Sequence, residues 1–135
     1  IMGANGAGKS TLLKSIAGIL PISSGDIWLG EHKLSAMTAT QKSQQLAYLA
    51  QSTEIHWDLS VYEVITLGLP QTLANAKEQE KVRSISETFS VTHLLDKPFQ
   101  QLSGGEKARV QLARCCIKEA PLLLADEPIA SLDPY

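Results

Sequence analysis

The chain has few cysteines, and this excludes whole classes of protein. Its 135 residues include only two, the neighbours Cys115 and Cys116. A small secreted domain held together by disulfides needs several spaced cysteines, whereas a pair inside an apolar helical pattern fits a reducing compartment. Adjacent positions also lack the spacing of a metal site, and no histidine is near them in the sequence. We therefore expect both cysteines to be small core residues.

The chain also lacks a block of like charge and a long apolar run. Twelve Lys and Arg residues stand against fourteen Asp and Glu residues, for a formal net charge of −2. Without a basic stripe there is no electrostatic surface for a nucleic-acid backbone, so we expect no nucleic-acid partner. No apolar run approaches the roughly 18 residues that a membrane span needs, and no signal peptide opens the sequence. These absences favour a soluble, cytoplasmic type of chain.

A glycine-rich stretch at the start carries the first chemical signal. Residues 3–11, GANGAGKST, satisfy the pattern G-x-x-x-x-G-K-[ST], and helical apolar spacing follows from Leu12 to a stop at Gly18. Glycines let backbone N–H groups surround a β-phosphate, Lys9 reaches the β- and γ-oxygens, and the Ser10 hydroxyl coordinates Mg²⁺. The alternative is a glycine-rich turn with a solvated lysine. The predicted phosphate-binding residues are Gly3, Asn5, Gly6, Ala7, Gly8, Lys9, Ser10 and Thr11.

A second glycine pair precedes a later helix. Ser103 has the hydroxyl preferred at a helix N-cap, and Gly104, Gly105 and Glu106 open a helix expected to run to about Lys118. Such a helix start offers unpaired N–H groups to an anion. Taken alone, the same pattern is more often a loop with a cap than a ligand site.

Polar residues follow two predicted strands at comparable places. The apolar run 46–50 ends at Gln51, and the run Leu122–Ala125 ends at Asp126 and Glu127. In a doubly wound parallel sheet the carboxyl ends of the strands bind ligands, beside the phosphate loop. Asp126 can hold Mg²⁺ alongside Ser10, and Glu127 can orient or deprotonate an attacking water. Gln51 can ligate Mg²⁺ or hold that water, unless it is only a loop residue.

Other segments predict a small antiparallel element and a helical insert. Residues 27–29 read as a short strand and 31–34 as its return. Trp28 could stack on an adenine, but we favour packing. Between residues 52 and 101 the pattern predicts one helix over 60–69, with Val61, Val64, Ile65 and Leu67 on its apolar face, and another over 74–89. His32 and His93 read as surface residues, and His56 and Trp57 as packing residues or a partner contact.

Together these motifs resemble the nucleotide-binding subunit of ATP-binding cassette (ABC) transporters over nearly the whole chain. Residues 3–11 match the Walker A loop, Gln51 the Q-loop and 102–106 the family signature; residues 122–126 match the Walker B strand, with Glu127 as the catalytic carboxylate, and 131–133 the D-loop. The resemblance implies an α/β P-loop NTPase fold with a parallel core sheet, a small antiparallel element and a helical insert. The core would comprise 1–51 and 102–135, and the insert 52–101.

The resemblance also implies a mechanism with ATP and Mg²⁺ as cofactors. Glu127, Gln51 and Lys9 would be catalytic, and Mg²⁺ would be held by Ser10, Gln51 and Asp126. Two subunits would dimerise head to tail around two ATP molecules. The signature residues of one copy would contact the ATP of the other, and the D-loop would lie at the dimer interface. The residues concerned are Ser103, Gly104, Gly105 and Glu106 of the signature, and Ser131, Leu132 and Asp133 of the D-loop.

The expected partners are a second ABC ATPase subunit, transmembrane permease subunits and a substrate-binding protein, with the chain peripheral on the cytoplasmic face of the plasma membrane. Residues 60–68 look like the helical region of importers for iron-siderophore, haem or cobalamin-type substrates. The competing interpretation is a soluble ABC ATPase of translation or DNA maintenance.

The two ends predict a fragment of a longer protein. The phosphate loop starts at Gly3 without the strand it should follow, and neither the adenine-stacking aromatic nor the switch histidine of the family is present. We therefore expect weak or no hydrolysis by residues 1–135 alone.

Overall fold

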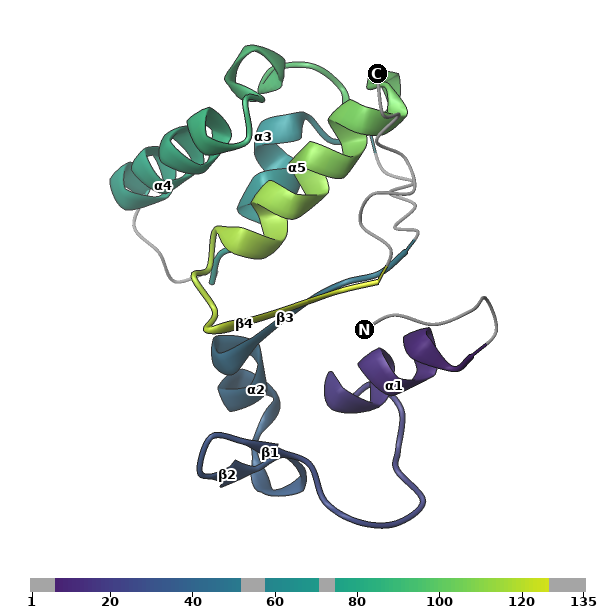
Figure 1. The fold of residues 1–135 in the computed structure, drawn as a ribbon. Helices are drawn as coiled ribbons and strands as arrows, with labels where there is room; N and C mark the ends of the chain where they lie inside the picture. Colours follow the sequence, from purple (N-terminus) through teal and green to yellow (C-terminus); the bar gives the residue numbers. More distant parts are fainter. Residues whose placement is uncertain (1–6, 52–57, 71–74, 127–135) are drawn as a thin grey trace.

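The computed structural model describes residues 7–51, 58–70 and 75–126 (Figure 1). Two paired strands lie between two groups of helices: α3, α4 and α5 are on one side of the pair, and α1 and α2 are on the other. The helices are α1 (Lys9–Ile16), α2 (Ala39–Gln45), α3 (Val61–Thr66), α4 (Asn75–Thr88) and α5 (Gly104–Cys116). The strands are β1 (Trp28–Leu29), β2 (His32–Lys33), β3 (Leu46–Leu49) and β4 (Leu122–Ala125), and short 3-10 turns cover Leu34–Ala36, Thr92–Leu94 and Phe99–Gln101.

The strand pairing agrees with the sequence-based expectation. β3 and β4 are parallel, with Leu46 opposite Leu122 and Leu49 opposite Ala125. β1 and β2 form the small antiparallel element, with Trp28 opposite Lys33. The α/β class with a parallel pair, an antiparallel pair and a helical segment is therefore confirmed.

Three helices begin with the same side-chain capping arrangement. Thr38 before α2, Ser60 before α3 and Ser103 before α5 each form a capping box with the residue three positions on. The cap hydroxyl accepts from that residue's backbone N–H, and the side chain of the same residue accepts from the backbone N–H of the cap. The sequence pattern of a hydroxyl residue followed by Glu or Gln thus fixes where these helices start.

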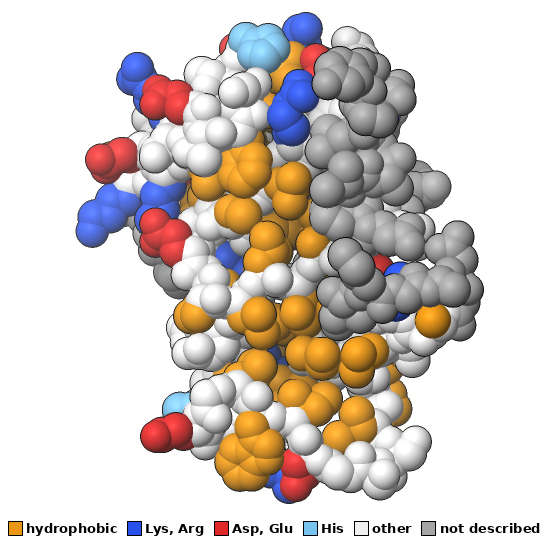
Figure 2. Space-filling model, in the orientation of Figure 1, with side chains coloured by type: hydrophobic (Ala, Val, Ile, Leu, Met, Phe, Trp, Pro, Cys, Tyr) orange, Lys and Arg blue, Asp and Glu red, His pale blue; other side chains and the backbone are white. Residues whose placement is uncertain are grey.

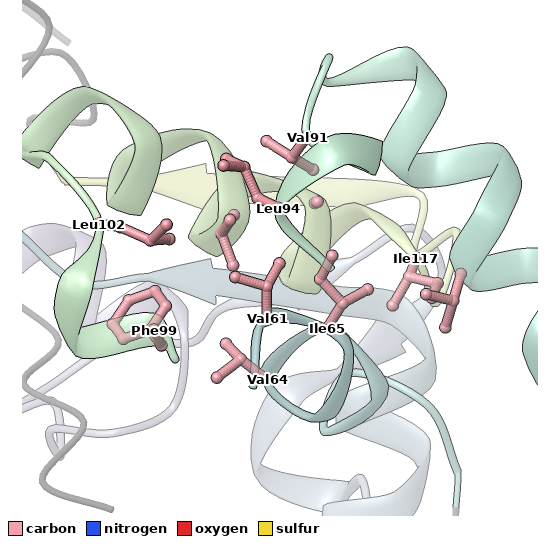
Figure 3. Close-up of a cluster of buried hydrophobic side chains, with 11 residues drawn as sticks. Val61, Val64, Ile65, Val91, Leu94, Phe99, Leu102 and Ile117 are labelled. Carbon is pink, nitrogen blue, oxygen red and sulfur yellow. The ribbon is translucent and has the colours of Figure 1, made fainter. Parts of the chain in front are cut away.

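The larger core cluster lies among the helices of the insert and α5 (Figure 3). Val61, Val64 and Ile65 of α3 are completely buried, as the predicted apolar face requires. Burial of one such side chain contributes about 1.5–3 kcal/mol relative to leaving it exposed. The other buried members are Val82, Val91, Leu94, Phe99, Leu102, Val110, Ala113 and Ile117.

Two sequence-based assignments are wrong. Leu67 was expected on the buried face of α3, but the helix ends at Thr66 and Leu67 is 55% exposed. Trp28 was expected to pack, but it is 58% exposed, because the two-residue strand pair that carries it is not covered by an opposing layer among the described residues. His32 and His93 are exposed, as expected.

The helix α5 contributes to a second, smaller cluster on its other face. Cys115 is buried there with Ala47 and Leu49 of β3. Cys116 is half-buried, and burial raises the pKa of both thiols. The core-residue interpretation is confirmed for Cys115 and only partly for Cys116. Because α5 packs on both clusters, the proposed boundary at residue 102 between insert and core stays a prediction.

Hydrophobic side chains also gather over the middle of one face of the molecule (Figure 2). The large hydrophobic residues with exposed side chains are Leu12, Ile19, Leu20, Ile22, Trp28, Leu67 and Leu123. Within the described ranges, no helix combines the length and apolar character needed to cross a membrane.

Candidate active site

The carboxyl ends of β3 and β4 bring two predicted site residues to one edge. The backbone N–H of Asp126 donates to the Leu49 carbonyl oxygen at 2.9 Å, which extends the parallel pairing to the point where both strands end. Gln51 follows β3 by two residues and is exposed. The parallel pairing therefore places the amide of Gln51 and the carboxylate of Asp126 at the same end of the sheet.

Asp126 is almost completely buried, with 3% of its surface exposed. Tyr48 of β3 lies on the same face of the strand pair as Asp126, because Tyr48 is opposite Leu124 and residues two apart share a face. Burial, and then the charge of Asp126, raise the pKa of Tyr48. An ionised carboxylate so far from water needs a compensating partner, and a hard divalent cation supplies one.

The helix α1 presents its N-terminus toward the same side of the molecule as the ends of β3 and β4 (Figure 1). Gly8 is its N-cap and has a φ of 81° and a ψ of 13°, a left-handed conformation that side chains disfavour. Lys9 and Ser10, the first helical residues, are half-buried, and Ala7 and Thr11 are exposed. Gly3, Asn5 and Gly6 lie outside the described residues. The left-handed Gly8 before the helix is compatible with a phosphate-binding loop, and the roles of the loop residues stay predictions.

The donor set fits Mg²⁺. A carboxylate from Asp126, a hydroxyl from Ser10 and an amide oxygen from Gln51 are all hard oxygen ligands of the kind that Mg²⁺ prefers. No group of three or more His, Cys, Asp or Glu side chains that could hold a metal occurs in the part of the chain that the structure describes. A mixed set completed by phosphate oxygens and water is how Mg²⁺ is held in phosphoryl-transfer sites.

The start of α5 has the predicted cap. Ser103 is the N-cap residue, with φ −64° and ψ 163°, and both Ser103 and Gly104 are exposed. The Glu106 carboxylate accepts from the Ser103 backbone N–H at 2.8 Å and from its hydroxyl at 2.7 Å. These hydrogen bonds, the backbone one first, lower the pKa of Glu106. Ser103 and Gly104 are thus exposed at a helix start whose backbone is fixed by the hydrogen bonds between Ser103 and Glu106.

Comparison with known proteins decides the family. A family model described as "ABC transporter" matches residues 1–130. The chain belongs to the ABC transporter family. The hemin import ATP-binding protein HmuV of Bordetella parapertussis is 43% identical over 99% of this chain and 55% of its own length. The thiamine import ATP-binding protein ThiQ of Aliivibrio fischeri is 40% identical over 99% of this chain and 57% of its own length.

A solved ABC transporter has the same fold. The structure, described as an inward-facing conformation of a putative metal-chelate type ABC transporter, superposes with a TM-score of 0.77 at 25% identity. The match covers 98% of this chain and 50% of that chain. This chain therefore spans about half the length of the relatives that it matches.

Several ABC motif residues assigned from the sequence fall outside the described residues. Glu127 and the D-loop residues Ser131, Leu132 and Asp133 are among them. His56 and Trp57, expected as packing residues or a partner contact, also lie outside the described residues. Their roles stay predictions. Lys9, Ser10 and Gln51 lie within the described residues, in the order that the ABC motifs have. Their chemical roles also stay predictions.

Sequence reasoning missed two polar groups in this ABC fold. The Tyr48 hydroxyl is buried without a hydrogen-bond partner among the described residues, on the face of the sheet that carries Asp126. The Gln111 side chain, 6% exposed, has neither its nitrogen nor its oxygen paired within the described ranges. Side chains alternate between the two faces of a strand, so the pairing of β3 with β4 could have indicated that Tyr48 shares a face with Asp126. Gln111 stands four residues before Cys115, on the sheet-facing side of α5, where a polar residue is unexpected.

The capping box of α3 provides a first prediction, on stability. In the full-length protein, Ser60→Ala should lower the free energy of unfolding by about 1 kcal/mol near neutral pH, because the α3 N-terminus loses its side-chain partner. Backbone and hydroxyl hydrogen bonds from Ser60 lower the pKa of Glu63 in the folded state. The stabilisation from Glu63 is therefore present above the unfolded-state pKa, and it is lost as the pH falls through the lower folded-state pKa.

The stability difference between wild type and Ser60→Ala should consequently shrink as the pH falls below about 4. Denaturant unfolding curves measured at a series of pH values test this. The exposed helical residue Ser84 provides the control, since Ser84→Ala removes no cap. A difference that stays constant into the acid range would contradict the assignment.

Proposed function

We propose that the chain forms the catalytic core of an ATP-binding and ATP-hydrolysing subunit of an ABC import system. The observation that carries the proposal is the buried carboxylate of Asp126 at the end of β4, beside the end of β3 that leads to Gln51. Such an edge, with the N-terminus of the phosphate-loop helix toward the same side of the molecule, supports binding of a nucleoside triphosphate. The import relatives support the direction of transport.

In this proposal the residues of the chain position ATP rather than react with it covalently. Lys9 and the loop N–H groups hold the β- and γ-phosphates, while Ser10, Gln51 and Asp126 hold Mg²⁺. The bound ion neutralises charge that develops on the phosphates. Glu127 orients the attacking water and accepts its proton. A rigid, partly buried arrangement of this kind accelerates phosphoryl transfer by positioning and electrostatics.

The exposed start of α5 supports the proposed dimer. Ser103 and Gly104 are exposed. In the proposed site Asp126 and the α1 N-terminus would contact one nucleotide, which would leave the α5 start for an ATP held by a second copy. ATP binding would then close a head-to-tail dimer, and hydrolysis would loosen it. The insert and Gln51 would transmit this movement to permease subunits, with the protein peripheral on the cytoplasmic face of the membrane.

We propose an iron complex, such as a haem, as the cargo. The hemin import relative and the metal-chelate type structure support this class, while the thiamine import relative shares the direction but not the cargo. A substrate-binding protein would deliver the complex.

Substitution of the α5 cap tests the proposed function. In the full-length protein, Ser103→Arg should leave nucleotide binding by the monomer nearly intact and abolish ATP-dependent dimerisation. The longer cationic side chain would occupy the space that the proposed dimer assigns to the partner's ATP. Equilibrium binding of a fluorescent ATP analogue and light scattering with and without ATP measure the two properties.

A matched control uses the other exposed cap with the same geometry. Thr38→Arg disrupts the capping box of α2, which has no place in the proposed interface, and should leave dimerisation unchanged. Loss of nucleotide binding by the Ser103→Arg monomer would argue against an in-trans role for Ser103. Equal loss of dimerisation in both variants would show an effect of cap disruption alone.

A further inference from the structure

A cavity of about 550 Å³ borders the sheet at Ala47 and Tyr48 of β3. Its walls come from α2, β3, the residues after α3, and the C-terminal part of α5, and α4 contributes one side chain. α2 and the end of α5 lie where β3 and β4 begin, whereas Gln51 and Asp126 follow the opposite ends of these strands (Figure 1). None of the described residues assigned to ATP or Mg²⁺ lines this cavity, although Tyr48, which shares a sheet face with Asp126, does. Its volume is within the range of small-molecule sites.

The cavity is lined by cations and by no described carboxylate. Lys81, Arg114 and Lys118 contribute the charges, and they come from two different helices and from the turn after α5. Lys81 forms an ion pair with Glu119 at 2.9 Å, but the Glu119 side chain is 77% exposed, so the pair is strongly screened by solvent. Arg114 lies beside the Cys115 thiol, which is a weak acceptor.

Lys118 is the least compensated of these cations. It is half-buried, and its Nζ donates to the Leu46 carbonyl oxygen at 2.8 Å. That acceptor is neutral, and it uses one of the three hydrogens of the ammonium group. A partly desolvated cation with a neutral partner is stabilised when an anion approaches it. Burial also lowers the pKa of Lys118, which agrees with missing compensation.

Part of the lining is apolar. Leu67, Leu69 and Pro70 contribute this part, and Leu67 is the residue whose exposure contradicts the helical pattern of α3. Thr40 and Gln44 of α2 add a hydroxyl and an amide to the lining. The cavity thus combines cationic and apolar side chains, as a site for an organic anion requires.

We propose that this cavity binds a small organic phosphate. Its phosphate group would contact Arg114 and Lys118, with Lys81 nearby, and its organic part would lie against Leu67 and Leu69. Because Lys81 is already paired with Glu119, the charges of Arg114 and Lys118 match the nearly two units on a phosphate monoester, and the guanidinium fork of Arg114 fits two phosphate oxygens. The ligand would join α5 to β3 and α2, which stabilises their present arrangement independently of the ATP site.

Titration of the full-length protein with phenyl phosphate and with inorganic phosphate, at matched ionic strength, tests the proposal. By calorimetry the wild type should bind phenyl phosphate more tightly than inorganic phosphate, because only the former has a group for the apolar part of the lining. Arg114→Met and Lys118→Met should each weaken phenyl phosphate binding by about tenfold or more, the size expected for one charged hydrogen bond. Lys118→Arg retains the charge and should preserve binding even if Lys118→Met is poorly folded.

Three further variants locate the bound anion. Lys77→Met removes an exposed cation of α4 outside the cavity and should change nothing, and Leu67→Ala should reduce only the advantage of phenyl phosphate. Since the phosphate loop is also an anion site in the proposed function, Lys9→Ala separates the two: binding lost in Lys9→Ala but kept in Arg114→Met and Lys118→Met would overturn the cavity proposal. Absence of binding to wild type, or equal weakening by Lys77→Met, would overturn it as well.

Discussion

Replacing Glu127 with glutamine should lower ATP turnover of the full-length protein by about a hundredfold or more, within the range for loss of a general base. Glu127 follows Asp126, whose buried carboxylate marks the end of β4. An amide can still contact the attacking water but cannot accept its proton. ATP binding should survive, and the ATP-bound dimer should accumulate because hydrolysis no longer loosens it. Steady-state phosphate release and light scattering in ATP measure the two effects.

A neutralised carboxylate elsewhere serves as the control. Glu31 is exposed in the turn between β1 and β2, so Glu31→Gln should leave turnover unchanged. If Glu127→Gln turned over ATP at the wild-type rate, the catalytic assignment would be wrong. The proposed ATP binding is tested separately, by the equilibrium binding of a fluorescent ATP analogue.

Gly68→Ala should have the largest effect on stability, a loss of about 3 kcal/mol or more. Gly68 lies two residues after the end of α3, where the chain passes directly over α5. A Cβ at this position would clash with the Arg114 carbonyl oxygen and lie 2.6 Å from the Ile117 Cγ2 atom. The first of these is backbone in the last turn of α5, which is packed on both sides, so it cannot move away cheaply. Denaturant unfolding of the full-length protein measures the loss.

The adjacent Leu67 provides the comparison. Its side chain is exposed, so Leu67→Ala should alter the free energy of unfolding by about 1 kcal/mol or less, although it removes more atoms than Gly68→Ala adds. A Gly68→Ala protein as stable as the wild type would show that α3 and α5 can separate locally.

Local sequence patterns predicted much of this fold. The apolar runs at 46–50 and 122–125 became the parallel strands β3 and β4, and the Ser103 hydroxyl located the start of α5. These features depend on neighbours along the chain, which a sequence displays directly. The glycine-rich loop and the polar residues that follow the strands are also local patterns of this kind.

Features set by distant contacts could not be read in this way. Periodicity placed Leu67 on the buried face of α3, but the close passage of Gly68 over α5 ends the helix before that residue. Trp28 is apolar in an apolar strand, yet burial needs an opposing layer that the strand itself does not specify. The unpaired Gln111 amide and the cation-lined cavity depend on how helix and sheet meet. No local pattern encodes that geometry.

The two-sided packing of α5 has a consequence for how the protein comes apart. Val110 and Ala113 are buried among the helices, while Cys115 is buried against β3, so one helix belongs to both clusters. Neither cluster can melt without exposing a face of α5 to water. The two clusters should therefore unfold as a single cooperative unit, and the backbone amides of α5 should be among the slowest in the chain to exchange with solvent.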